Sequence, residues 1–231
     1  MSAPSRVLGA ARALRTGGLL FQYASNVYDY VSIPHDPNQN VAGDFTLVLW
    51  VFLKHPLQPA SFIHKGTWPA IINYFFANQT YTTNHYFVFS DTNSYLIGSG
   101  SIPLNRWSRW ICIKRGNFMG VYRDGSLIQG RDDISGSPQP STEPIELGKY
   151  GASYASCMID KVRLYNRALS EEERDGIFSR DALVREGLIL CLEFTEGEGT
   201  GVQDLGPHRY TGTIYGRASW AVKRASRTLQ L

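Results

Sequence analysis

The stretch from Met158 to Phe178 reads M-I-D-K-V-R-L-Y-N-R-A-L-S-E-E-E-R-D-G-I-F and decides the fold. In its first half, apolar residues such as Val162 and Leu164 alternate with polar ones, which predicts a strand with one buried face. In its second half, Ser170 precedes Glu173 by three residues, which is the spacing of a capping box at a helix start. Two further glutamates in the first turn favour the helix as well. The stretch therefore predicts a strand that leads into one short helix.

The rest of the chain is typical of a β protein. Its 231 residues include 22 glycines, 11 prolines and 13% aromatic residues, which suits many short strands joined by tight turns. The continuously apolar run Phe45–Leu53 predicts a strand that is buried on both faces. Asp124 and Gly125 provide the positive φ angles of a two-residue hairpin turn. Cys112, Cys157 and Cys191 are widely spaced, and we expect buried free thiols.

Four motifs occur in an order that resembles laminin-G-like, or concanavalin A-like, jelly-roll domains. They are the opening strand Tyr30–Pro34, the core strand Phe45–Val51, the Trp107–Ile128 hairpin and the run that starts with I-E-L-G-K-Y at Ile145. The strand and capped helix that follow resemble the closing motif of the same family. The resemblance covers roughly residues 19–180 and implies an all-β antiparallel sandwich with one short helix near 171–178.

The last part of the chain resembles a family segment that often precedes the opening strand. Residues 187–220 carry this segment here at the end, so the chain resembles a circular permutant. We expect residues 19–220 to form one sandwich. Segment 187–220 either completes the sheet of its own chain or pairs with the sheet of a neighbouring chain. Residues 1–18 and 221–231 are basic. They are either solvated tails or arms that dock on partners. The candidate assembly residues are Arg6, Arg12, Arg15, Arg224, Arg227, Leu229 and Leu231.

Aromatic and amide side chains interleave between Trp68 and Tyr95, and this mixture suits a glycan surface. Sugar rings stack on aromatic faces, while amides and carboxylates bind sugar hydroxyls. Alternation predicts that Tyr74, Phe76, Phe87 and Phe89 point into the core instead. The candidate glycan ligands nearer the loops are Trp68, Tyr81, Asn84, His85, Asp91 and Tyr95.

One loop offers oxygen ligands in a pattern that calcium could use. Asp36, Asn38 and Asn40 follow a D-x-N-x-N spacing, and Asp160 opens the signature strand. Calcium is bound by about six to eight such oxygens, and related sandwiches bind it at a loop rim. The same spacing also arises in ordinary turns, so calcium is a possible cofactor and no other cofactor is expected.

Catalytic motifs are absent from the sequence, and we expect no enzyme activity. The nearest carboxylates to a glycosidase pair are Glu193 and Glu196, and they lie in a glycine-rich turn. A net charge of +3 does not favour nucleic acid. No apolar run approaches the ~18 residues needed to cross a bilayer, and no secretion signal is visible.

These observations favour a non-enzymatic structural or adhesion module of an extracellular assembly. A virus or phage particle, with this chain as a decoration, spike or tail component, fits the basic arms and the missing signal. Its partners would be other subunits of the particle or further copies of itself. The alternative is a carbohydrate-binding, lectin-like module, and a glycoside hydrolase is a remote third.

Overall fold

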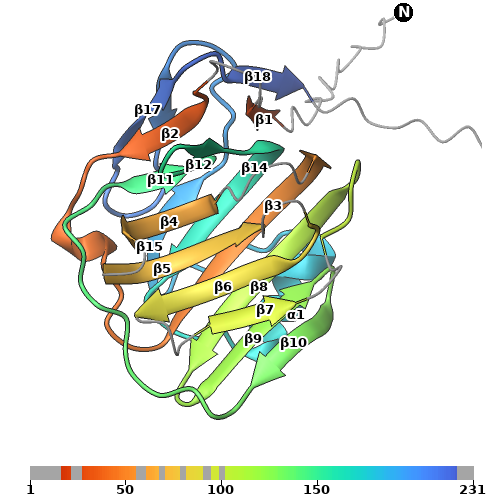
Figure 1. Cartoon of the computed structure of the whole chain (residues 1–231), viewed down its shortest axis with the longest axis vertical. Coiled ribbons are helices and arrows are strands. Elements are labelled where there is room, and N and C mark those ends of the chain that lie inside the picture. The colour runs from red at the N-terminus through yellow and green to blue at the C-terminus, as the bar shows by residue number, and fades with distance from the viewer. Residues whose placement is uncertain are drawn as a thin grey trace, which may run out of the picture.

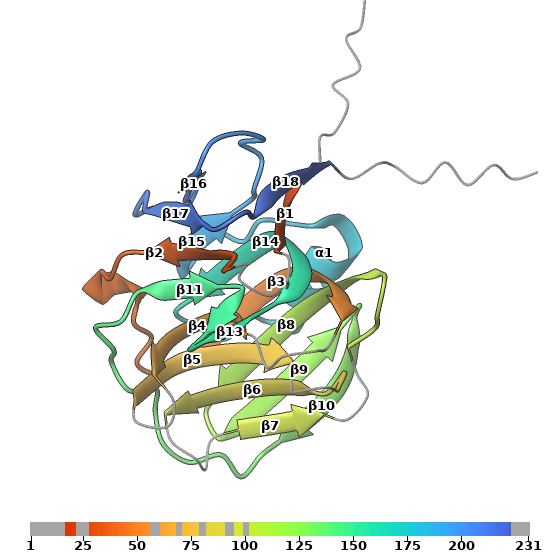
Figure 2. The same ribbon diagram turned by 45° about the horizontal axis from the view of Figure 1, so that its top comes forward.

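A computed structural model describes residues 17–21, 28–55, 61–67, 71–78, 82–90, 95–98 and 102–222. Two antiparallel sheets lie face to face, and one short helix packs on the outer side of one sheet (Figures 1 and 2). The expected all-β sandwich with a single short helix is confirmed. No helix in these ranges is long and apolar enough to cross a membrane.

Sheet A has eight strands and carries the signature strand β14 at its centre. Along the sheet the order is β10, β9, β8, β3, β14, β1 and β18, and β15 also pairs with β14. The bounds are β10 (Ser126–Arg131), β9 (Phe118–Arg123), β8 (Trp107–Arg115), β3 (Phe45–His55), β14 (Ser156–Tyr165), β1 (Gly17–Phe21), β18 (Ser219–Val222) and β15 (Leu188–Leu192).

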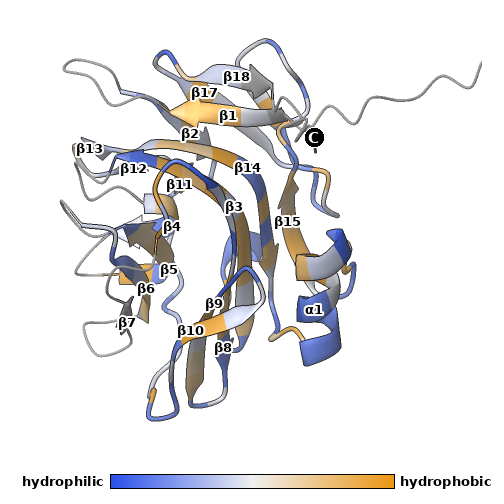
Figure 3. Ribbon diagram, turned by 90° about the vertical axis from the view of Figure 1, so that its right-hand side faces the viewer, coloured by the Kyte–Doolittle hydropathy of each residue, from blue (hydrophilic) through white to orange (hydrophobic). Residues whose placement is uncertain are grey.

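Sheet B also has eight strands and forms the opposite layer (Figure 3). A separate pair, β12 (Lys149–Tyr150) and β13 (Ser153–Tyr154), follows β11 along the chain, and a 3-10 turn, η1 (Pro37–Gln39), follows β2. In order, sheet B contains β16 (Gly201–Gln203), β17 (Thr211–Tyr215), β2 (Tyr30–Ile33), β11 (Ile145–Leu147), β4 (Ser61–Thr67), β5 (Ile71–Asn78), β6 (His85–Ser90) and β7 (Tyr95–Gly98).

The segment after residue 187 contributes to both sheets. Strand β15 pairs with β14, β17 with β2, and β18 with β1, all within this one chain. The β1–β18 ladder joins Gly17 to Val222, so the sheet extends two residues beyond the predicted 19–220 at each end. Exchange of this segment between chains stays a prediction. The remaining parts of the two basic arms lie outside the described residues.

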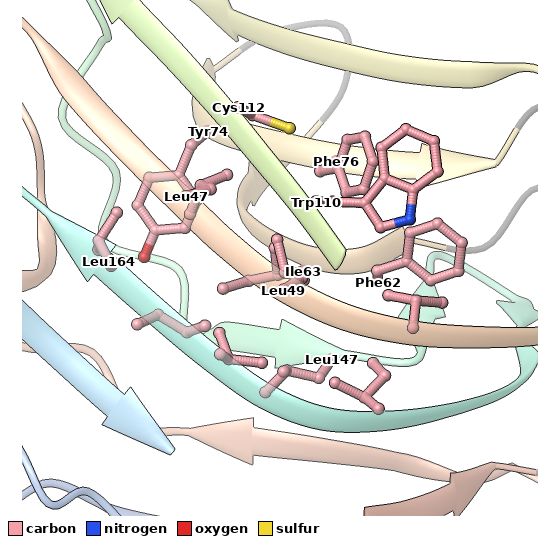
Figure 4. Packing of buried hydrophobic residues seen from close by; sticks show 14 of the residues in the cluster. Leu47, Leu49, Phe62, Ile63, Tyr74, Phe76, Trp110, Cys112, Leu147 and Leu164 are labelled. Atoms are coloured by element: carbon pink, nitrogen blue, oxygen red, sulfur yellow. The ribbon is translucent and has the colours of Figure 1, made fainter. Parts of the chain in front are cut away.

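Aromatic side chains fill the space between the sheets (Figure 4). Trp110 is fully buried, and its ring centroid lies 5.4 Å from that of Phe76. The core positions expected for Tyr74, Phe76, Phe87 and Phe89 are confirmed, since all four are 0% exposed. The three cysteines are free and buried, as predicted. Apolar alternation along the strands is therefore enough to place the inner layer.

The helix α1 (Glu171–Arg180) covers part of the outer face of sheet A. Its capping box forms as predicted: the Glu173 N–H donates to Ser170 Oγ at 3.3 Å, and the Ser170 N–H donates to Glu173 Oε2 at 2.8 Å. Ile177 then packs on Val48 and Ile111 of the sheet. This second apolar layer explains why β3 is buried on both faces, as its continuous apolar run predicts.

We expect the capping hydroxyl to stabilise the fold measurably. Replacing Ser170 with alanine leaves the Glu173 N–H without its partner and lowers the free energy of unfolding by about 1 kcal/mol. Urea denaturation measures this difference. Ser179→Ala is the matched control, because Ser179 lies in the same helix and its hydroxyl donates only to Asp175 O. Equal effects of the two substitutions would contradict the capping role.

Candidate functional site

Tyrosine rings line one part of the outer face of sheet B. Tyr30 and Tyr215 are directly opposite each other on β2 and β17, and their rings stack 4.7 Å apart at 8°. Tyr154 of β13 lies 6.3 Å from Tyr30 and 5.2 Å from Tyr28, measured between ring centroids. Tyr28 is 55% exposed and Tyr215 is 45% exposed, so solvent and ligands can reach these rings.

A polar centre adjoins these rings. Lys149 Nζ lies 4.4 Å from the Tyr30 ring centroid and 2.8 Å from Glu146 Oε1. The other oxygen of Glu146 lies 3.4 Å from Nε2 of His64, on the neighbouring strand β4. We name the rings and this centre together the tyrosine strip; its members are Tyr28, Tyr30, His64, Phe75, Glu146, Lys149, Tyr150, Tyr154 and Tyr215.

The charges of the polar centre are held by their mutual contacts. Burial opposes ionisation of Glu146, but the hydrogen bonds and charges of His64 and Lys149 outweigh it and lower the pKa of Glu146. Burial likewise opposes the charge on Lys149, and the bond to Glu146 outweighs it and raises the pKa of Lys149. Both groups are therefore ionised at neutral pH and can bind hydroxyl groups of a ligand.

A cavity of about 300 Å³ opens beside the polar centre. At this cavity, the centroid of the Tyr150 ring lies 5.4 Å from that of His64 and 5.0 Å from that of Phe75 of β5. The strip therefore extends across β17, β2, β11, β4 and β5. The cavity is lined by His64, Gly66, Thr67, Glu143, Pro144, Glu146, Lys149, Tyr150 and Gly151.

Strand alternation explains why these side chains face outwards. In β11, Glu146 stands between Ile145 and Leu147, which are both fully buried in the core. In β2, Tyr30 likewise precedes the buried Val31. The outward positions of neighbouring strands then meet across the sheet.

Ser61, His64 and Glu146 form a chain that resembles a catalytic triad in composition. Ser61 Oγ lies 2.7 Å from His64 Nδ1, but it donates its own hydrogen to Lys149 O at 2.6 Å. His64 is then the donor to Ser61, and Ser61 is fully buried. The histidine cannot accept the serine hydrogen in this arrangement, so Ser61 is not activated as a nucleophile. Its contacts instead fix β12 against β4.

The structure describes only some of the glycan candidates predicted from the Trp68–Tyr95 segment. Trp68, Tyr81 and Asp91 lie outside the described residues, and so does the side chain of Tyr95, whose backbone is part of β7. Asn84 is half-buried in the turn before β6, where its N–H donates to Thr82 Oγ1.

His85 is not part of an accessible surface. It is fully buried, and its ring lies 5.8 Å from Trp110 and 6.3 Å from Phe76. Burial, together with the charge of Arg123, lowers its pKa to about 4, so the ring is neutral at physiological pH. His85 lies next to a turn, as expected, but it is the first residue of β6 and points to the same inner face as Phe87 and Phe89, so its side chain is not accessible.

The predicted calcium ligands have other partners. Asp36 caps η1 by accepting from the Asn38 N–H at 2.8 Å, and Asn40 Oδ1 accepts from the Ser141 N–H at 3.0 Å. Asp160 is buried in β14. Within the described ranges, no three His, Cys, Asp or Glu side chains gather as a metal site would require. Calcium at this loop stays a prediction, as does assembly through the arm residues, which are not described.

The carboxylates nearest to a glycosidase pair have structural contacts. Glu193 lies 2.8 Å from Lys161 and 3.0 Å from Arg163. Burial opposes its charge, but these two cations outweigh it and lower the pKa of Glu193. A general acid needs the opposite shift. Glu196 Oε1 accepts from the Gln203 N–H at 2.8 Å and closes the glycine-rich turn.

Sequence reasoning did not identify the tyrosine strip. Four of its members lie within residues 146–154, and the other five come from segments that are far apart in the chain. The available signal was the presence of tyrosine at outward positions, as in V-Y-D-Y and T-I-Y. Only the pairing order of sheet B shows that these positions adjoin.

Lys65, next to His64 in β4, is buried without a carboxylate contact. Its Nζ donates to Glu143 O at 2.6 Å and to Gln39 Oε1 at 3.2 Å, and it lies 3.0 Å from His35 Nδ1. Burial lowers the pKa of Lys65 to about 8, against the smaller opposing charges of Glu143 and Asp36. The ammonium thus holds the η1 loop and the irregular segment before β11 to the edge of the cavity.

Comparisons with known proteins give a family and a fold. The laminin-G family model described as the concanavalin A-like lectin/glucanases superfamily matches residues 25–173. No curated protein matches the chain in sequence.

Among solved structures, a Bacteroides ovatus protein proposed to bind carbohydrate is similar, with a TM-score of 0.70 and 17% identity over 91% of this chain. The chain covers 61% of that protein. The heptameric SAP-like pentraxin of Limulus polyphemus has a TM-score of 0.65 at 12% identity, over 91% of this chain and 96% of the pentraxin. A botulinum neurotoxin type C structure has a TM-score of 0.55 at 12% identity, over 73% of this chain and 43% of the toxin chain. At these identities the likeness concerns the fold alone.

The buried lysine predicts how stability depends on pH. The pKa of Lys65 is about 8 in the folded chain against 10.5 when unfolded, so between these values the unfolded state binds more protons. The contribution of Lys65 to the free energy of unfolding therefore rises as the pH rises from about 8 to 10.5. We expect an NMR titration of the Lys65 side chain with a midpoint near 8. The pH-dependent rise should be smaller in Lys65→Met, and a midpoint above 10 would contradict this assignment.

Proposed function

This chain belongs to the concanavalin A-like lectin/glucanases superfamily, and we propose that it is a carbohydrate-binding module that holds a glycan along the tyrosine strip. The observation that carries the proposal is the arrangement on sheet B: accessible tyrosine rings adjoin an ionised Glu146–Lys149 pair and a cavity of about 300 Å³. Ligand sites typically combine apolar area with a few convergent polar groups, and a protein has few such places.

The strip offers both kinds of contact that a sugar needs. The exposed rings of Tyr28 and Tyr215 can stack on the apolar faces of sugar rings. Glu146 accepts hydrogen bonds from sugar hydroxyls, and Lys149 donates them. Neighbouring strands are about 4.8 Å apart, so the four steps from β17 to β5 span roughly 19 Å. A short oligosaccharide lying across the strands matches this length better than a single sugar.

The same groups support binding rather than hydrolysis. Glu146 is kept ionised by Lys149 and His64, so it does not hold the proton that a general acid must donate. Ser61 is buried, with its hydroxyl hydrogen committed to a backbone carbonyl. We therefore propose a module without catalytic activity of its own.

Two structural neighbours agree with the proposal. The Bacteroides ovatus protein is itself proposed to bind carbohydrate, and the neurotoxin's cell entry depends on two ganglioside molecules. The particle-assembly role rests on basic arms that have no described residues beyond β1 and β18. Glycan binding is therefore the function that the site supports best.

We expect two substitutions in the strip to weaken glycan binding. Tyr215→Ala removes an exposed stacking ring, which costs about 1 kcal/mol or roughly fivefold in Kd. Glu146→Gln removes a charged acceptor, which costs roughly tenfold. A glycan array identifies the ligand, and calorimetry with that ligand measures both effects.

Leu127→Ala is the control, because Leu127 is 51% exposed on β10 of the other sheet. All three variants should unfold at temperatures near that of the wild type. If a glycan binds and neither strip variant changes its Kd, the strip is not the site. If no glycan on the array binds to the wild type, the proposed function itself is wrong.

A further inference from the structure

A second cavity, of about 350 Å³, lies on the outer face of sheet A. Trp50 and Phe52 point outwards from β3, directly opposite Arg109 and Trp107 of β8. The Phe52 and Trp107 ring centroids are 5.7 Å apart. The cavity is lined by Trp50, Trp107, Ser108, Arg109 and Asp124.

The apolar layer beneath the helix does not extend over this half of the outer face. The apolar layer beneath α1 includes Val48 of β3 and Ile111 of β8, and it stops before the next outward positions, Trp50 and Arg109. Trp107 is half-buried, and Asp124 in the β9–β10 turn is exposed. Trp50 is only 8% exposed, because Arg109 and Lys161 lie 4.5 and 4.6 Å from its ring centroid. The accessible aromatic surface is therefore that of Trp107 and the half-buried Phe52.

Arg109 is the exceptional charge in this cavity. Its guanidinium stacks 4.5 Å from the centroid of Trp50 and donates one hydrogen bond to Phe178 O, at the end of α1. Among the described residues, no carboxylate lies within ion-pair distance of this guanidinium. The neighbouring cations all have such partners: Arg106 pairs with Asp124, and Lys161 and Arg163 pair with Asp181 and Glu193.

We propose that this cavity binds a carboxylated sugar unit, with the carboxylate on Arg109 and the sugar ring against Trp107. A guanidinium has five N–H donors in a planar fork that fits a carboxylate, and Arg109 uses one on Phe178 O. The indole ring provides the apolar face for stacking, while Asp124 accepts from hydroxyls at the rim.

The charge balance selects an acidic sugar over a neutral one. Binding a neutral ring would remove water from Arg109 without supplying an anion, which is costly for a charged group. The exposed Arg106, with 58% of its side chain accessible, adds a second cation at the entrance. Its pair with Asp124 is a surface pair and contributes little, so Arg106 can turn towards the ligand. This inference does not depend on the tyrosine strip, because the two sites occupy outer faces of different sheets.

Chemical shifts of the indole N–H groups test the proposal on the intact chain. We titrate the wild type with galacturonate oligomers, with uncharged galactose oligomers, and with a sulfated monosaccharide. The expected result is a saturable shift of the Trp107 and Trp50 signals with the galacturonate oligomers alone, weakened by added salt. Shifts of equal size with the uncharged oligomers, no shift with any probe, or shifts with the sulfated sugar alone would each overturn the carboxylate assignment.

Two variants locate the contact. Arg109→Gln should raise the Kd for galacturonate oligomers roughly tenfold or more, since it removes a charge-assisted pair. Arg109→Lys keeps the charge without the fork and should fall between Arg109→Gln and the wild type. Because Arg109 also contacts Phe178, each variant is checked by its unfolding temperature, and the wild-type shifts decide the matter if a variant fails to fold. Leu205→Ala is the control, because Leu205 is 48% exposed and belongs to neither site, and it should leave this Kd unchanged. An unchanged Kd in Arg109→Gln would refute the site.

Discussion

The pairing of β14 with three other strands holds the sandwich together. On one side, β14 pairs with β3 from Ser156 to Tyr165. On the other side, its first half pairs with β1 and its second half with β15. An irregularity between Ile159 and Val162 separates these two halves. Segments from the start, the middle and the end of the chain therefore depend on one strand, and a one-residue slip in it would turn every side chain to the wrong face.

The alternation of β14 determines what each face of sheet A contains. Val162 and Leu164 point into the core, whereas Lys161 and Arg163 point outwards and meet Asp181 and Glu193. Asp181 is the C-cap of α1, so these ion pairs also place the end of the helix. A buried ion network of this kind contributes little net stability. Removing one partner is nevertheless costly, because it leaves an unpaired buried charge. The position of α1 in turn limits how far it covers Trp50 and Arg109.

Local chemistry made much of the fold predictable. The Ser170–Glu173 capping box, the Asp124–Gly125 turn and the buried run of β3 each depend on neighbouring residues, and each occurs where the sequence predicts it. The sites were less predictable because they depend on which strands become neighbours. Tyr30 and Tyr215 stack only because β2 and β17 pair, and no pattern in either segment carries that information. His85 shows the converse: a polar residue beside a loop is in the core, because it belongs to β6 and points to the same face as Phe87 and Phe89.

The two outer faces differ in how their cations are balanced, and this difference determines which ligand charge each face favours. On sheet B, the opposite charges of Lys149 and Glu146 balance each other, so this ion pair of the tyrosine strip favours hydroxyl groups over a ligand with a net charge. On sheet A, the Arg109 guanidinium stacks on Trp50, and among the described residues no carboxylate lies within ion-pair distance of it. Burying that guanidinium under a ligand is favourable only if the ligand supplies the anion. Because a buried apolar core lies between the sheets, the two outer faces are separate surfaces, and the two sugar sites that we propose can differ in their chemistry.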